Sequence, residues 1–126
     1  MSVRTLLRVQ SVLFILAGLV TLFAPQQFMA TYGAELNEPG IGLARLFGAT
    51  SLMAAVIYWL GGTTTPSEAR RALVIGGLVG NILAAVVGIL NVLSGAFNAL
   101  LWGSVVLWLL LALGFAYFLF ARPEAA

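Results

Sequence analysis

The chain contains no histidine and no cysteine, and its charged residues include neither lysine nor aspartate. Without cysteine, disulfides, thiolate metal sites and cysteine nucleophiles are excluded. Without histidine and lysine, the chain lacks the base that intramembrane serine proteolysis needs and the usual axial ligand of haem. These absences predict a protein that is not an enzyme, with no catalytic residues and with no cofactor or metal site.

Charge of either sign is scarce. Only 8% of the 126 residues are charged, against about 25% in an average soluble protein. Hydrophobic residues make up 62% of the chain, and a soluble domain of this size leaves too much of its surface exposed to hide them. The six arginines are spread over several segments and form no basic face of the kind that binds nucleic acid. The composition therefore predicts an integral membrane protein with no nucleic-acid partner.

The uncharged stretches place the membrane spans. One helix needs about 20 residues to cross the hydrocarbon layer. The charges leave room for four helices, at about residues 6–24, 40–60, 72–93 and 98–121, with a tight Ser-Gly-Ala-Phe-Asn turn between the last two. Only helices and closed barrels satisfy every backbone group in a bilayer, and the alternation of barrel strands is missing. The expected fold is an all-α, four-transmembrane-helix bundle forming one domain over residues 1–126.

The arginines predict the orientation. Five of the six fall on one side of the membrane if both termini lie in the cytoplasm, and only Arg45 falls on the other. Because basic residues favour the cytoplasmic side, we expect both termini there. The first span is expected to be retained rather than cleaved as a signal peptide, since Pro25 directly follows Ala24.

The connection between the first two spans is the longest one. Pro25 suits the first turn of a helix and Gly33 suits the end of one. We therefore expect a short amphipathic helix lying along the outer membrane surface. In the next connection, Ser67 is the expected N-cap of the third span.

Arg45 is the one charged residue well inside an expected span. One hypothesis is that it extends to the outer headgroups or pairs with Glu35 or Glu38. The alternative is an anion or lipid-headgroup site at the outer face, which these same residues would form.

Two asparagines lie within the third span, Asn81 near its middle and Asn91 near its outer end. An amide in hydrocarbon needs a partner, and a hydrogen bond between helices is the simplest one. The alternative is a polar pathway to which Asn81 contributes with Thr50, Ser51 and Ser104.

Small residues recur every four positions along the third span, at Gly76, Gly80, Ala84 and Gly88. Such a ridge lets another helix approach closely. Packing within the bundle is the first expectation, and self-association of two copies through this face is the alternative.

Several short motifs resemble one family. The first span ends in LFAP (22–25), the second opens with LARLFGA (43–49), the loop before the third reads PSEARR (66–71), and the fourth ends in LGFAYF (113–118). This layout resembles the small four-helix bacterial membrane proteins of the DoxX-like and related uncharacterised type. The resemblance covers nearly the whole chain, and it implies a multi-pass protein of the bacterial inner membrane without implying an activity.

Three functions are compatible with these observations. The leading one is a non-enzymatic accessory or scaffold subunit of a membrane complex, with membrane lipid and another membrane protein or a second copy of the chain as partners. The alternative is a channel or transporter for a small neutral or anionic solute that uses Arg45 and Asn81. An enzyme acting on lipid or quinone through Arg45, Tyr32 and the outer glutamates has the least support, because no base with a suitable pKa is evident.

Overall fold

The computed structural model describes all 126 residues, and its regular structure is entirely helical. Four of its helices are long and apolar enough to cross a membrane. They are α1 (Val3–Phe23), α3 (Glu38–Gly61), α4 (Glu68–Leu93) and α5 (Leu101–Ala116), the last extended by the π-helical turn η1 (Tyr117–Ala121). The short helix α2 (Pro25–Thr31) connects α1 to α3, and a 3-10 turn, η2 (Pro123–Ala125), lies near the C-terminus. The prediction of four apolar helices is confirmed, with boundaries that differ by a few residues.

Polar side chains cap the N-terminal ends of three of the four long helices. The Ser67 side chain accepts a hydrogen bond of 3.2 Å from the backbone N–H of Arg70, which confirms its predicted role as N-cap of α4. Asn37 caps α3 in the same way, by accepting from the N–H of Gly40 at 2.9 Å. Each cap satisfies a backbone donor that the first turn of a helix leaves free.

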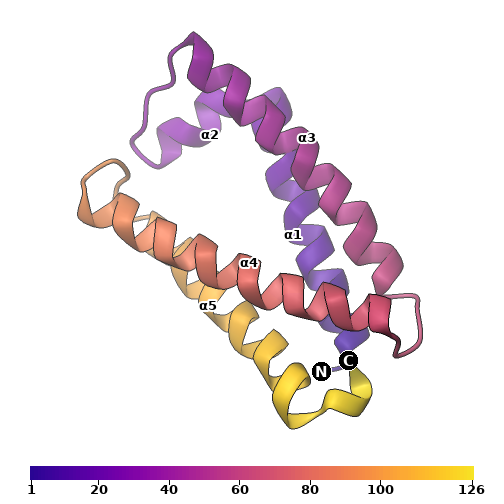
Figure 1. Cartoon of the computed structure of the whole chain (residues 1–126). Coiled ribbons are helices and arrows are strands. Elements are labelled where there is room, and N and C mark those ends of the chain that lie inside the picture. The colour runs from indigo at the N-terminus through magenta and orange to yellow at the C-terminus, as the bar shows by residue number, and fades with distance from the viewer.

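The four long helices form two hairpins rather than one evenly closed bundle. Helix α1 packs along α3, and α4 packs along α5 (Figure 1). The hairpins meet near the two chain termini and diverge toward α2 (Figure 1).

Glycines join α1 to α3. A Cβ atom on Gly48 would lie 2.8 Å from the carbonyl oxygen of Gly18 and 2.8 Å from the amide nitrogen of Leu22. Only the absence of a side chain lets these two backbones approach so closely. Further along the same pair, the Ser11 hydroxyl donates a hydrogen bond of 2.6 Å to the carbonyl of Ala55.

Glycines also join α4 to α5. A Cβ on Gly77 would lie 2.6 Å from the Phe115 ring, and one on Gly88 would lie 2.8 Å from both Trp108 and Val105. The buried positions along α4 are spaced three or four residues apart, and they are Arg70, Val74, Gly77, Asn81, Ala85 and Gly88.

The expected ridge on α4 is therefore only partly used for packing. Gly88 lies in the seam with α5 and Ala84 is half-buried, but Gly76 and Gly80 are exposed, and a Cβ on Gly80 would meet nothing within 4 Å. A spacing of four residues drifts by about 40° per step around an α-helix. Four such positions thus spread over about 120° and cannot all face one neighbour.

Apolar side chains close the molecule where the hairpins meet, at what we call the closed end. Its core is a cluster of eight buried residues from α1, α4, α5 and the C-terminal turns: Val3, Leu6, Leu7, Val74, Leu111, Phe115, Phe118 and Ala126. Leu7 and Phe115 have no exposed surface at all. This cluster is the only large apolar core, and it lies at one end of the helices rather than at their middle.

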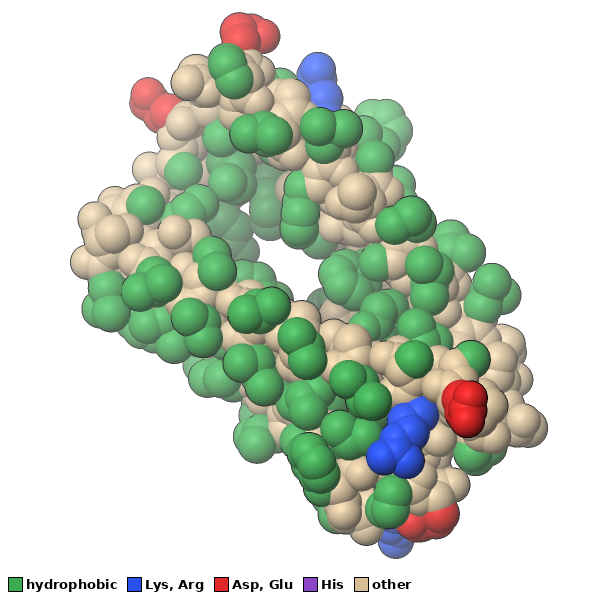
Figure 2. Space-filling view, viewed as in Figure 1, with side chains coloured by type: hydrophobic (Ala, Val, Ile, Leu, Met, Phe, Trp, Pro, Cys, Tyr) green, Lys and Arg blue, Asp and Glu red, His purple; other side chains and the backbone are tan.

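Beyond the closed end the hairpins separate and leave a space that we call the opening, which Figure 2 shows between α3 and α4. Two pairs of glycines mark the separation. A Cβ on Gly114 of α5 would lie 3.2 Å from Leu6 of α1, whereas one on Gly103, three turns away on nearly the same face, would meet nothing. Likewise Gly76 of α4 lies opposite the Tyr58 hydroxyl of α3, and Gly80, one turn further, lies opposite nothing.

A polar contact closes the far side of the opening. Asn98, in the α4–α5 turn, donates through its side chain to the carbonyl of Thr31 at 3.0 Å and through its backbone N–H to the carbonyl of Tyr32 at 2.8 Å. The Tyr32 hydroxyl lies 3.3 Å from that of Ser104 on α5. We call this contact between the end of α2 and the second hairpin the α2 bridge.

Candidate functional site

The opening has an amide pair at its base. The Asn81 side-chain nitrogen donates to the Gln10 side-chain oxygen at 2.9 Å and to the carbonyl of Gly77 at 2.7 Å. Gln10 is 5% exposed and Asn81 3%. The pair links α1 of one hairpin to α4 of the other, one helical turn beyond Leu6 and Gly77 of the closed end. It is the interhelical hydrogen bond expected for Asn81.

Gln10 was not identified from the sequence as a functional candidate. The signal for it was nevertheless present, since it is a polar residue within the first apolar run. A buried glutamine in a membrane helix requires a partner for the same reason that an asparagine does. The sequence does not indicate that α1 and α4 approach each other at the level of Gln10 and Asn81.

The apolar cluster of the closed end begins directly below the amide pair. A polar solute that reached Asn81 from the opening would meet the side chains of Leu7, Val74 and Phe115, all of which are fully buried. A polar path through the molecule would require these side chains to part. In the arrangement described, the amide pair is an isolated polar contact rather than one point on a continuous path.

None of the other residues expected along a polar pathway forms a hydrogen bond with Asn81, whose partners are Gln10 and Gly77. The Thr50 hydroxyl donates within its own helix, to the carbonyls of Leu46 and Phe47 at 3.1 and 2.9 Å. Ser104 belongs to the α2 bridge. Asn91 is half-buried and lies ten residues from Asn81, which is about 15 Å along the helix. Ser51 is buried on α3.

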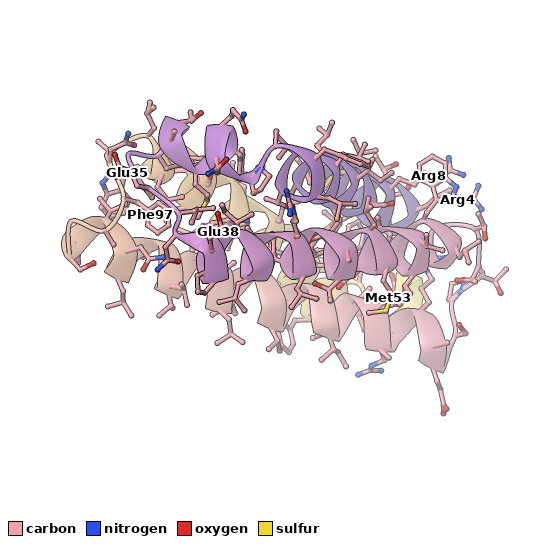
Figure 3. The ribbon with its side chains drawn as sticks, turned by 90° about the horizontal axis from the view of Figure 1, so that it is seen from above. Arg4, Arg8, Glu35, Glu38, Met53 and Phe97 are labelled. Carbon is pink, nitrogen blue, oxygen red and sulfur yellow. The ribbon has the colours of Figure 1, made fainter.

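The ion pair considered for Arg45 is not formed. Arg45, Glu35 and Glu38 are all exposed, and Arg45 forms no ion pair with either glutamate. Figure 3 shows Glu35 and Glu38 at the end of the molecule that carries α2, opposite Arg4 and Arg8. Arg45 therefore shares no site with Asn81, and its exposure agrees with a side chain that extends to lipid headgroups.

A shallow apolar groove of about 250 Å³ lies between α1 and α3. Its one polar side chain is Ser11, whose hydroxyl already donates to Ala55 within the seam. The groove thus offers no free polar group to orient a ligand, and the opening between the hairpins remains the best candidate for a functional site.

Comparison with known proteins adds no relative to this description, because no family model, no curated protein and no solved structure matches the chain.

Proposed function

We propose that the protein is a non-enzymatic accessory or scaffold subunit of a membrane complex, and that the opening between its hairpins receives an apolar segment of another membrane protein. The observation that carries the proposal is the separation of the hairpins beyond the closed end. Gly80 and Gly103, one on each helix of the second hairpin, have no neighbour there, and the opening passes between the two hairpins (Figure 2).

A space of this kind inside a bilayer is filled by lipid chains or by protein. Glycine at its walls favours protein, because a face without side chains lets a helix backbone approach and gain van der Waals contact. The apolar cluster and the α2 bridge hold the two hairpins together at either end of the opening. A partner segment would therefore bind between helices whose separation is already set. Membrane lipid occupies the remaining outer faces.

The residues around the opening also support a role without catalysis. The polar groups at its base are the two amides of Gln10 and Asn81, and each is engaged with the other. The four glutamates, which are the only carboxylates of the side chains, lie at helix starts, in a loop or in the C-terminal turn. A general acid or base would need a titratable group at the reacting position, and none lies there.

Site-specific photo-crosslinking tests the proposal. A photoreactive phenylalanine analogue is introduced in living cells at position 80 or 103, and a control carries it at Gly42, which also has no neighbour within 4 Å but lies in the first turns of α3. A discrete protein adduct from positions 80 and 103, absent from position 42, is the expected result. Adducts to lipid alone at all three positions would contradict it.

We further propose that the chain is a DoxX-like protein of the bacterial inner membrane with both termini in the cytoplasm. The separation of charge along the molecule supports this orientation, since Arg4 and Arg8 lie at the closed end and Glu35 and Glu38 at the other (Figure 3). Reporter fusions at the two termini should both give the cytoplasmic signal. A periplasmic signal from either fusion would overturn the topology.

A channel or transporter for a small neutral or anionic solute is the second candidate. Its support is the buried amide pair, because polar groups inside a membrane are costly and are commonly functional. This function requires the apolar cluster to part during transport. Solute flux into liposomes that is lost on Asn81→Leu or Arg45→Ala, but retained in Asn91→Leu, would favour it over the scaffold role.

A further inference from the structure

Three arginines from two helices surround the α3–α4 turn at the closed end. Arg4 and Arg8 are one turn apart on α1 and lie side by side at this end of the molecule (Figure 3). The turn runs against both of them, since a Cβ on Gly62 would lie 3.2 Å from Cγ of Arg8 and 3.4 Å from the carbonyl of Arg4. Arg70, in the first turn of α4, donates through Nη1 to the carbonyl of Thr64 at 2.8 Å. Arg4 and Arg70 thus both lie against the same turn.

This cluster contains positive charge without a matching carboxylate. None of the three arginines forms an ion pair, and Glu68, in the same first turn of α4, is exposed and also unpaired. The other charged residues beyond α5, Arg122 and Glu124, are also free of ion pairs with these side chains. Like charges held together without a counter-ion repel each other, so the folded arrangement favours the binding of an anion.

One nitrogen atom of the Arg70 guanidinium also lacks a partner. Its side chain is 8% exposed, and its Nε is buried without any hydrogen-bond partner. A guanidinium has five N–H donors arranged as a fork that fits phosphate oxygens. A buried donor of a charged group that lacks an acceptor is costly, and an anion placed between Arg70 and Arg4 would supply one.

The position of the cluster points to the membrane surface. The Arg8 guanidinium carbon lies 5.3 Å from the centre of the Trp59 ring near the end of α3. Tryptophan settles at the level of lipid headgroups, and contact with its ring fixes the guanidinium while leaving its N–H groups free. The N-terminus of α4, which contributes a partial positive charge, begins beside the same turn.

We propose that Arg4, Arg8 and Arg70 form a binding site for a phosphate group, that of an anionic phospholipid in the leaflet next to the closed end. The site is independent of the opening and of whatever occupies it. Phosphate is the chemistry that the three forks recognise, and the level of Trp59 favours a lipid headgroup over a free ion.

Binding to the purified full-length chain in detergent tests the proposal, with native mass spectrometry as the measurement. The probes are dioctanoyl phosphatidylglycerol, the zwitterionic dioctanoyl phosphatidylcholine, and inorganic phosphate. The Arg4→Gln/Arg8→Gln double variant, which leaves Arg70 and its contact with the turn in place, should weaken binding of phosphatidylglycerol about tenfold or more, because each charge-assisted hydrogen bond contributes strongly. Arg70→Lys should also weaken it, because lysine keeps the charge but loses the fork.

Arg45→Gln is the matched control, since it removes an arginine from the other end of the molecule, and it should leave binding unchanged. Inorganic phosphate that binds as tightly as the lipid, with the same loss in the double variant, would support the phosphate site and identify a free ion as its source. Equal binding of phosphatidylcholine, equal weakening by Arg45→Gln, or no binding of either phosphate-bearing anion would overturn the proposal.

Discussion

The two ends of the opening are held by different forces. At the closed end, apolar side chains from both hairpins interlock around Phe115, which is fully buried. At the α2 bridge, the contact consists of the hydrogen bonds donated by Asn98, one hydrogen bond between the hydroxyls of Tyr32 and Ser104, and one edge-on aromatic contact between Tyr32 and Phe97. The contact at the closed end depends on close packing between many side-chain atoms, and the α2 bridge depends on a few polar groups near the membrane surface.

This difference shows how the molecule divides into units. Within each hairpin, glycine seams run along the helices and leave no room for a Cβ atom unless a neighbouring atom shifts. Between the hairpins, the contacts are the apolar cluster, the amide pair, a hydrogen bond of 3.4 Å from the Tyr58 hydroxyl to the carbonyl of Leu73, and the α2 bridge. In a bilayer the lipid is as apolar as leucine, so close packing and hydrogen bonds decide which helices associate. We therefore expect each hairpin to be a stable unit. When the protein is destabilised, the contacts between the hairpins should be lost before the contacts within them.

The largest effect is expected from a cavity at the closed end. Phe115→Ala removes a ring that packs against Gly77 and lies 6.4 Å from the ring centre of Tyr58, and a buried large-to-small change costs about 2–5 kcal/mol. The free energy of unfolding in mixed detergent micelles should fall accordingly. Phe120→Ala serves as the control because Phe120 is 74% exposed. Equal losses in both variants would show that the closed end is not a packed core.

Added bulk in a hairpin seam should have the next largest effect. Gly48→Leu places side-chain atoms against the backbone of Gly18 and Leu22, which cannot move aside as a flexible side chain could. Overpacking of this kind costs about 1–3 kcal/mol, and the thermal midpoint in detergent should drop. Gly42→Leu, where a Cβ meets nothing within 4 Å, should leave the midpoint unchanged. A midpoint unaffected by Gly48→Leu would argue against the seam.

The amide pair should contribute less. Asn81→Leu breaks the bond to Gln10, and interhelical hydrogen bonds in membranes contribute about 0.6–2 kcal/mol. A double-mutant cycle with Gln10→Leu isolates the shared contribution, because the second substitution removes the amide that the first leaves unpaired. Unfolding free energies that are simply additive across the cycle would mean that the two side chains do not interact.

The smallest effect on stability is expected at the α2 bridge, where Asn98→Ala removes the side-chain bond to Thr31 at a cost of about 0.5–1.5 kcal/mol. Its effect on shape should be clearer. Because the chain has no cysteine, spin labels can be attached to cysteines introduced at positions 35 and 96. The distance distribution between them should broaden in the Asn98→Ala background, while a pair at the closed end, at positions 63 and 124, keeps its width. Unchanged distributions at both ends would contradict a bridge that holds the hairpins.

Much of the fold could be predicted because it depends on local composition. Runs of about 20 apolar residues define a span wherever they occur, and Pro25, Ser67 and the Ser-Gly turn mark helix ends by their own backbone preferences. The α4 ridge shows the limit of such patterns. Gly76 and Gly77 are neighbours of identical chemistry, yet only Gly77 packs against Phe115, because the face that a helix buries depends on where its neighbours lie.

The candidate site follows the same division. That Asn81 needs a hydrogen-bond partner follows from its position in an apolar span, but that the partner is Gln10, 71 residues away in the chain, follows only from the way the hairpins meet. The sequence by itself determined that the chain forms four helices of membrane length, since length and hydrophobicity are properties of each segment alone. Only the tertiary structure decided that these helices form two hairpins with an opening between them, because which faces meet depends on the shapes of side chains far apart in the sequence.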